Sequence, residues 1–287
     1  MALDIYQHVT DRVIQALEHG TVPWRSPVRT RGGRWPHNIV TNREYRGINT
    51  FLLALTAMAE GYRSGGWLTF RQAQARGAHV KKGEKSTLVI FWKPHQTNDK
   101  ESGEDITVPV LRHYRVFNAE QCDRLAVEDG ETGEEIAPFQ RIKEAESICE
   151  GFVEGPEVVH GGVIPRYEAR HDRVELPDPE AFVSAEEYYA TRFHELGHAT
   201  GHSTRLDRGV DTQPRAFGSA EYAKEELIAE MTAAMLCGVA GIDAATIDNA
   251  AAYVQSWLQR LRDDKQLVVT AAGKAQKAAD YVLGRER

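Results

Sequence analysis

The chain has 287 residues, of which 41% are hydrophobic and 27% are charged, a composition typical of a globular protein with about two domains. No apolar run approaches the roughly 18 residues that a membrane-spanning helix needs, and the opening MALDIYQHVTDRVIQAL lacks the apolar region of a secretory signal. We therefore expect a soluble protein without a membrane partner.

The formal net charge of −7 conceals a difference between the two ends of the chain. Residues 1–125 carry 18 Lys and Arg against 12 Asp and Glu, whereas residues 126–287 carry 17 against 30. A basic front half and an acidic rear half indicate two different tasks. The cysteines are odd in number and lack CxxC spacing, which argues against a disulfide framework and favours the cytoplasm.

The front half, residues 1–125, is predicted to be a small α+β domain. Helical periodicity covers residues 4–18, and a buried helix is expected between Asn49, as its N-cap, and Gly61. A short helix near residues 70–76 is followed by strands at 87–92 and 107–117. A polar hairpin tip, residues 95–105, joins these two strands.

Aromatic and cationic residues alternate through this half, and four of the five tryptophans lie in the first 92 residues. Bases stack on flat rings while cations follow the phosphate backbone, so the pattern predicts binding of single-stranded DNA. The alternative is that the rings fill a core beside a solvated basic surface. The residues predicted to contact DNA are Trp24, Arg25, Arg43, Tyr45, Arg46, Trp67, Lys81, Lys82 and Lys85.

Residues 126–140 are acidic and poor in large apolar side chains, and we predict that they form a linker. The rear domain, residues 141–287, is predicted to be mainly helical with a short sheet. A helix at 142–151 precedes short strands near Val158, at 166–169 and at 174–176, with a turn at His171 and Asp172. Residues 246–283 have the pattern of amphipathic helices that pack the domain.

The stretch SAEEYYATRFHELGHATGH, residues 184–202, carries the strongest chemical signal. Ser184 followed by Glu187 forms a capping box that starts a helix, and Gly201 ends it. His194 and His198 then lie on one face at metal-binding distance. Together with Glu195 as general base they predict a site for zinc or another divalent ion, the alternative being a surface helix with a salt-bridging glutamate.

Two imidazoles leave zinc short of protein ligands, and two sources of a third ligand compete. His202 lies eight residues after His194, about 12 Å along a helix, so it can bind only if the chain reverses. The downstream helix, starting after Ser219, offers Glu226 and Glu230, while helical spacing places Glu225 toward solvent. The arrangement resembles that of gluzincins, which implies that Glu226 binds the metal and Glu230 orients a histidine; exchanged roles, or salt bridges alone, stay open.

Several segments in order resemble the ArdC-type antirestriction proteins, whose front part is similar to the N-terminal part of TraC-type plasmid primases. They are VPWRSP, TNREYRGINTFLL, WLTFRQAQARGAHVKKGEKSTLVIFW, HELGHATGH, EELIAE and YVQSWLQRLRDDKQLVVTAAGKAQKAADYV. The resemblance implies a front domain that binds single-stranded DNA and a rear domain of the zincin metallopeptidase type. It also implies a mobile-element protein that protects incoming DNA from host restriction, with a host protein as peptidase substrate. In zincins a strand that leads into the HExxH helix lies beside the extended substrate, so the strand at 174–176 is expected there.

Overall fold

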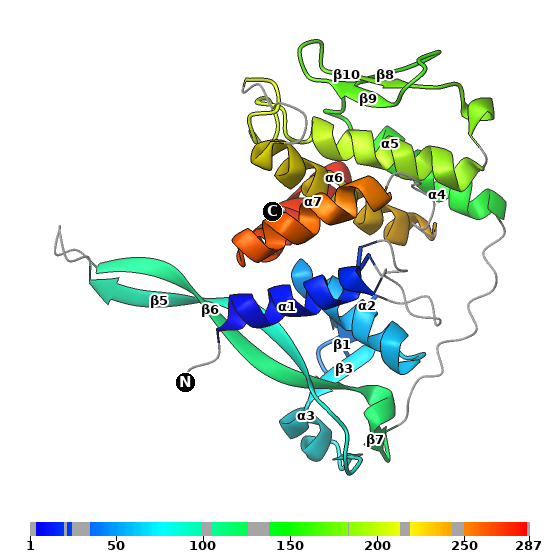
Figure 1. Ribbon diagram of the computed structural model, residues 1–287. Helices are drawn as coiled ribbons and strands as arrows, with labels where there is room; N and C mark the ends of the chain where they lie inside the picture. The colour runs from blue at the N-terminus through cyan, green and yellow to red at the C-terminus, as the bar shows by residue number, and fades with distance from the viewer. Residues whose placement is uncertain are drawn as a thin grey trace.

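The computed structural model describes residues 4–19, 22–24, 35–98, 105–125, 138–182, 184–212, 219–242 and 250–285 (Figure 1). Most of the predicted linker and the predicted DNA contact Arg25 lie outside these ranges. Helices and sheets occur together, which confirms the α+β class. Among the helices of these ranges, none combines the length and the apolar character needed to cross a membrane.

A five-stranded sheet with the order β2-β1-β3-β6-β5 supports the front half. Neighbouring strands within this sheet are antiparallel, except for β1 and β3, which are parallel to each other. The predicted hairpin is confirmed as β5 and β6, and both strands run further toward the tip than their apolar residues predict. A separate pair joins β4 to β7. The strands are β1 (His37–Asn38), β2 (Arg43–Glu44), β3 (Gly66–Thr69), β4 (His79–Val80), β5 (Thr87–Asn98), β6 (Asp105–Asn118) and β7 (Cys122–Asp123).

The helices of the front half are α1 (Ile5–Glu18), α2 (Ile48–Glu60) and α3 (Phe70–Ala75), with a 3-10 turn η1 (Ala119–Gln121). Gly61 ends α2 in the left-handed conformation, as predicted. The predicted N-cap Asn49 is wrong, because the helix begins after Gly47 at φ 59°. The side chain of Asn49 instead donates to the carbonyl of Ile90 and accepts from its N–H, which covers the outer edge of β5 at that residue.

In the rear half, α6 runs through the middle of a helical bundle, and α4, α5, α7 and α8 pack around it (Figure 1). The three predicted short strands form a sheet with the order β8-β10-β9 that contacts α5. The helices are α4 (Pro138–Gly151), α5 (Ala185–Ala199), α6 (Ala220–Ala240), α7 (Ala250–Asp263) and α8 (Leu267–Val282). The strands are β8 (Glu157–His160), β9 (Arg166–Glu168) and β10 (Arg173–Leu176), followed by the 3-10 turn η2 (Pro179–Ala181).

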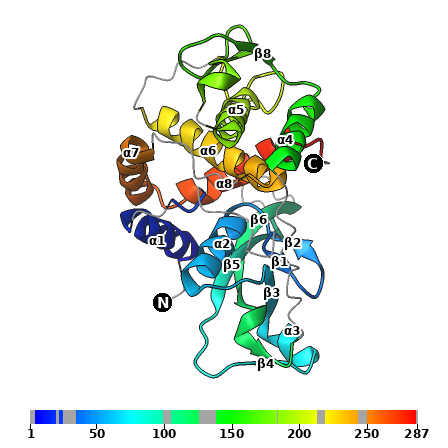
Figure 2. The same ribbon diagram turned by 90° about the vertical axis from the view of Figure 1, so that its right-hand side faces the viewer.

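The two halves share their main hydrophobic core. Val13 of α1 and Phe51 of α2 belong to the same buried cluster as Trp257 of α7 and Val268 of α8. Figure 2 shows α1 and α2 beneath the rear-half helices. Polar contacts join the same surfaces, since Arg46 pairs with Asp280 of α8. The front and rear domains predicted from the sequence are therefore in contact through a continuous core.

Candidate metal centre

Local sequence fixes the helix that carries both histidines. The side chain of Ser184 accepts a hydrogen bond from the backbone N–H of Glu187, as predicted, and begins α5. The four-residue spacing puts His194 and His198 on one face, with their Nε2 atoms 3.1 Å apart. Two ring nitrogens that approach this closely share either a proton or a cation.

A glycine inside the motif lets the second helix come close. A Cβ atom on Gly197 would lie 3.1 Å from Cα and 3.2 Å from the carbonyl oxygen of Ala229 on α6. The backbones of α5 and α6 are therefore nearly in contact at this point. Glu226 lies one helical turn before Ala229 on α6, and this close approach brings its carboxylate to the histidine pair.

The ligand atoms of His194, His198 and Glu226 lie within 4.8 Å of one another. The carboxylate oxygens of Glu226 are 3.5 Å from Nε2 of each histidine. Tetrahedral zinc holds nitrogen and oxygen ligands at about 2.0–2.1 Å, which places pairs of donor atoms about 3.3 Å apart. The observed spacings of 3.1 and 3.5 Å fit a divalent ion bound by these three groups.

The ionisation of the cluster shows how strongly it attracts positive charge. Burial alone would lower the pKa of His194, but its hydrogen bond to Glu226 and the charges of Glu195 and Glu230 outweigh burial and raise the pKa to about 9. For Glu226 burial opposes ionisation, yet the two histidines hold the pKa near 2. The buried Nδ1 of His194 has no hydrogen-bond partner. A cation is the charge that this pocket of carboxylates stabilises.

The remaining predicted candidates are placed around this cluster. Glu195 and Glu230 are both buried, and both lie near enough to His194 to raise its pKa. Glu230 is not one of the three convergent groups. His202 lies in the turn after α5, where Nδ1 is 2.9 Å from Oγ1 of Thr204 and Nε2 is 3.5 Å from Asp211. The structure thus brings Glu226, rather than His202, to the histidine pair.

Glu225 corrects the sequence prediction. It was expected to face solvent but is 6% exposed, because every residue of α6 from Glu225 to Gly238 is buried and the helix has no solvent face there. Its Oε1 atom lies 3.8 Å from Nδ1 of His198, on the side of the ring away from Glu226. A carboxylate in this position orients a metal-binding imidazole, the role that the sequence assigned to Glu230.

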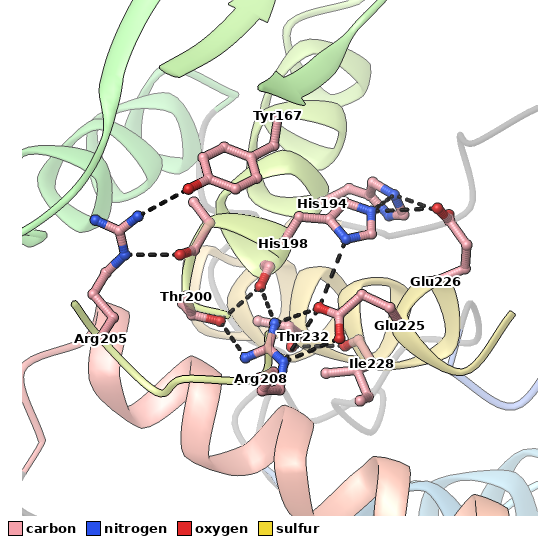
Figure 3. A network of polar contacts seen from close by, with 12 residues as sticks. Tyr167, His194, His198, Thr200, Arg205, Arg208, Glu225, Glu226, Ile228 and Thr232 are labelled. Atoms are coloured by element: carbon pink, nitrogen blue, oxygen red, sulfur yellow. Dashed lines mark hydrogen bonds and ion pairs between the residues drawn. The ribbon is translucent and has the colours of Figure 1, made fainter. Parts of the chain in front are cut away.

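Arg208 holds Glu225 in place (Figure 3). Its guanidinium pairs with the carboxylate of Glu225 and also donates to the Gly197 carbonyl and to Oγ1 of Thr200. The side chains of Arg208 and Glu225 are 6% and 7% exposed. The hydrogen bond with His198, and then the hydrogen bond and charge of Arg208, hold the pKa of Glu225 far below its usual range despite burial. The loop after α5 therefore fixes the support of His198, which sequence spacing gave no means to predict.

A second arginine fastens the same loop to the small sheet. Arg205 pairs with Asp172 in the turn between β9 and β10 and donates to the carbonyl of Ala199. It also donates to the hydroxyl of Tyr167 of β9 (Figure 3). Asp172 adopts φ 48° in that turn, which confirms the predicted turn. The sheet, the end of α5 and the loop carrying Arg208 are thus held as a unit.

The strand that leads into α5 has no free edge to which a substrate could add. β10, which leads into α5, is the central strand and pairs with β8 on one side and β9 on the other. An extended peptide cannot add to a strand whose two edges are already paired. The expectation that residues 174–176 lie beside an added strand is therefore wrong.

The structure places the predicted aromatic DNA contacts in the core. Trp24 and Trp67 are 0% exposed and Tyr45 is 7% exposed. Trp24 packs edge-on against Trp257, with ring centroids 5.2 Å apart. The prediction that these three rings stack on bases is wrong, because a buried ring presents no face to a base. The alternative of core aromatics beside a basic surface holds for them.

Those predicted cations that the structure describes are on the surface, with different surroundings. Arg43, Lys82 and Lys85 are exposed. Lys81 is exposed and donates to the carbonyl of Glu120, while Arg46 is tied to α8 through Asp280.

Exposed rings do occur on β5, at Phe91 and Trp92, which are not among the predicted contacts. Neighbouring residues of a strand point to opposite faces, so Phe91 and Trp92 cannot both face the same core. This adjacency is the sequence signal that at least one of the two rings is exposed.

Comparison with known proteins matches the front and rear halves of the chain to two family models. Residues 3–117 match the family model described as the N-terminal domain of anti-restriction factor ArdC. Residues 144–274 match the model described as zincin-like metallopeptidase. Among solved structures, antirestriction protein ArdC from plasmid R388 is similar in a metal-free form, with 38% identity, a TM-score of 0.80, and coverage of 99% of this chain and 100% of that one. Its Mn(II)-bound form has a TM-score of 0.78, with 98% of each chain covered.

Two curated relatives extend the comparison. The uncharacterized protein y4eC of Sinorhizobium fredii is 38% identical over 99% of this chain and 92% of its own length. DNA primase TraC of Escherichia coli is 37% identical over 98% of this chain, which spans only 27% of that primase. The similarity to TraC thus concerns one part of a much longer protein.

Proposed function

Because the chain belongs to the ArdC antirestriction family, we propose that it is a cytoplasmic protein that binds single-stranded DNA with its front half and hydrolyses peptide bonds at a zinc centre in its rear half. In this proposal it protects the incoming DNA of a mobile element from host restriction, and a host protein is the peptidase substrate. The domain boundaries are those expected from the sequence, near residues 126–140.

The convergence of His194, His198 and Glu226 is the observation that carries the enzymatic half of the proposal. Their spacing suits a tetrahedral ion. The neighbouring Glu195 supplies a buried carboxylate on the same helix. Three protein ligands leave room for a substrate or water, as in catalytic rather than structural zinc sites.

The residues have distinct roles in the proposed reaction. His194, His198 and Glu226 hold the ion, and Glu225 keeps the His198 ring in position from the Nδ1 side. When bound, zinc supplies Lewis acidity that lowers the pKa of water and polarises a peptide carbonyl. Glu195 accepts the proton of the attacking water and returns it to the amine that leaves.

Glu195→Gln tests this assignment. The variant keeps the size of the side chain and all three metal ligands, so it should bind metal as wild type does and lose peptide hydrolysis. Metal content and cleavage of candidate host proteins would be measured together with restriction protection during DNA transfer. Full protection by a variant that has lost cleavage would rule out peptidase chemistry as the basis of antirestriction.

The second candidate function is a DNA-binding protein whose metal only stabilises the fold. The shared core of the two halves favours this candidate. An ion between α5 and α6 would stabilise α6, which packs against α7 and α8, and these two helices contact α1 and α2 of the front half. His194→Ala separates the two. The DNA-binding candidate predicts that protection falls only as far as folding stability falls, whereas the enzyme predicts loss of protection in protein that is still folded.

For the front half, the exposed cations predict binding that weakens steeply with salt. The sequence-predicted contacts that lie on the surface are Arg43, Arg46, Lys81, Lys82 and Lys85, of which Arg46 is paired with Asp280. Titration of wild type with labelled single strands at increasing salt tests this half of the proposal. Affinity that does not change with salt would contradict it.

A further inference from the structure

The hairpin of β5 and β6 extends past α1 and away from the helices of the rear half (Figure 1). At its base, Val89 and Ile90 are buried in the core. Further out, every described side chain from Phe91 to Gln96 is exposed. We call the residues 91–96 and 107–112 the outer ribbon. It is a two-stranded arm in which the β5 side chains are exposed, while Leu111 of β6 is half-buried and packs against the main core.

One face of this arm combines rings and cations. Phe91, Lys93 and His95 alternate along β5 and so share a face, and Arg112 of β6 lies directly opposite Phe91. The ring of Phe91 rests edge-on against that of Tyr114, with centroids 5.5 Å apart. Phe91 is nevertheless 39% exposed, so the contact with Tyr114 braces the ring without covering it.

The opposite face has a different character. Trp92, 51% exposed, pairs with Leu111, and the next pair outward is Pro94 with Pro109. The outer ribbon thus has an apolar face without lysine or arginine, and a mixed face with Phe91, Lys93 and Arg112. Among residues 91–96 and 107–112, the lysine and arginine side chains lie on the mixed face alone.

The edge of the arm is closed to another β-strand. The N–H and carbonyl of Ile90 point outward to Asn49, so by the alternation of an antiparallel ladder the backbone of Pro94 also points outward. Proline has no N–H, and its place on the edge removes a donor that an added strand would need. A partner of the outer ribbon is therefore bound by side chains on a face.

Nearby charges increase the positive potential at the base of the arm. His8 of α1 has a lowered pKa, first because of burial and then because of the charges of Arg12, Arg115 and His113. Arg115 and His113 of β6 pair with Leu88 and Ile90, so their side chains lie on the face of Trp92, opposite to Arg112. These charges at the base of the arm are therefore separate from those of the mixed face.

We propose that the mixed face of the outer ribbon is a binding site for single-stranded nucleic acid, with a base stacked on Phe91 and phosphates beside Lys93 and Arg112. This inference rests on the proposed DNA binding of the front half and places it at residues that the sequence did not select. Stacking needs an unpaired base with a free face, so a duplex does not satisfy the site.

The experiment measures the affinity of the full-length chain for a labelled oligothymidylate of about 20 nucleotides over a range of salt concentrations. Phe91→Ala should weaken binding roughly 5- to 150-fold and leave the salt dependence unchanged, since only stacking is lost. Lys93→Gln combined with Arg112→Gln should lower the slope of log affinity against log salt by about 1.4. A loss of affinity without a change in slope, and a change in slope for the charge variant, distinguish loss of a contact from a general loss of folding.

Matched controls are available on the same molecule. Trp92→Ala removes a larger exposed ring from the neighbouring position on the other face and should bind like wild type. Arg71→Gln with Arg76→Gln removes two exposed charges of the α3 region and should leave the slope unchanged. A duplex of the same length should bind less tightly and be insensitive to Phe91→Ala.

Three results would overturn the inference in distinguishable ways. Suppose that wild type binds single strands. If Phe91→Ala then binds equally well, or if Trp92→Ala is the variant that binds more weakly, the front half binds DNA but the mixed face is not the site. If wild type does not bind single strands even at low salt, the proposed DNA-binding function fails together with the site. Equal losses of single-strand and duplex binding in Phe91→Ala would also exclude base stacking.

Discussion

The two candidate sites differ in where they lie relative to the core. The metal centre is built from side chains on the facing surfaces of two buried helices, α5 and α6, which a glycine allows to approach closely. The candidate nucleic-acid site lies on a ribbon that leaves the core after Ile90. The metal centre depends on the close packing of two helices. The candidate nucleic-acid site depends on the exposure of aromatic side chains, a residue type that fills the interior elsewhere in the front half.

This difference explains which residues matter for stability and which for binding alone. Substitutions of the buried pair that supports His198 are expected to change both folding and metal binding, whereas substitutions of a ligand alone change metal binding. Substitutions on the outer ribbon are expected to change nucleic-acid binding with little effect on folding.

The largest contrast is expected between two tryptophans of the front half. Trp24→Ala removes a fully buried ring from the shared core and should lower the free energy of unfolding by about 3–5 kcal/mol. Trp92→Ala removes a half-exposed ring and should change it by less than about 0.5 kcal/mol. Denaturant unfolding of both variants measures this. Similar stabilities for the two would mean that Trp24 is not a core residue.

The next effect concerns Arg208. Replacement by Met leaves the buried carboxylate of Glu225 without its cation, and we expect a loss of about 3–5 kcal/mol in the free energy of unfolding. Adding Glu225→Gln removes the stranded charge and should recover much of the loss. If the double variant is less stable than Arg208→Met alone, the two side chains do not act as a pair.

These groups also show how far the sequence predicts the fold and the site. The spacing of His194 and His198 and the cap at Ser184 depend only on local helix geometry, so the motif and its helix could be predicted. The choice of Glu226 as a ligand came from the resemblance to gluzincins, and spacing alone left Glu230 and His202 open. The burial of Glu225 could not, because the expected solvent face of α6 is covered by neighbouring helices. Arg208 comes from a loop whose path follows no periodic rule.

The front half shows the same limit. The hairpin and the ends of α2 follow from alternation and glycine positions. Whether Trp24 or Trp92 faces solvent depends on contacts with residues far along the chain, such as Trp257. The shared core likewise joins the basic front half and the acidic rear half, which their composition presents as separate units.

A smaller effect is predicted for the orientation of His198. Glu225→Gln should weaken metal binding about 10- to 100-fold, because the ring loses the carboxylate beside Nδ1. Metal titration of this variant and of its combination with Arg208→Met separates orientation from folding. Restored stability with weak metal binding in the combination is the expected result. Wild-type affinity in both would show that Glu225 has a purely structural role.

A change without any substitution is expected in the dependence of metal affinity on pH. The carboxylates around His194 raise its pKa to about 9 in spite of burial, so metal must displace a proton at neutral pH. Affinity should therefore rise about tenfold per pH unit from pH 7 and level off near pH 9. Calorimetry in buffers with different protonation enthalpies counts the released proton. Affinity that is flat over this range would contradict the raised pKa.

The same shift has a consequence for the metal-free protein. A pKa raised above the ordinary value of 6.5 stabilises the fold fully below that pH. This contribution is lost as the pH rises through about 9.

The most direct test of the metal centre is the metal content of wild type, Glu226→Gln and Glu230→Gln after equilibrium dialysis against a limiting concentration of zinc. The three convergent ligands predict that wild type and Glu230→Gln retain a single tightly bound ion and that Glu226→Gln loses it while remaining folded. Retention of the ion by Glu226→Gln, with loss from Glu230→Gln, would contradict the ligand set on which the proposed chemistry depends.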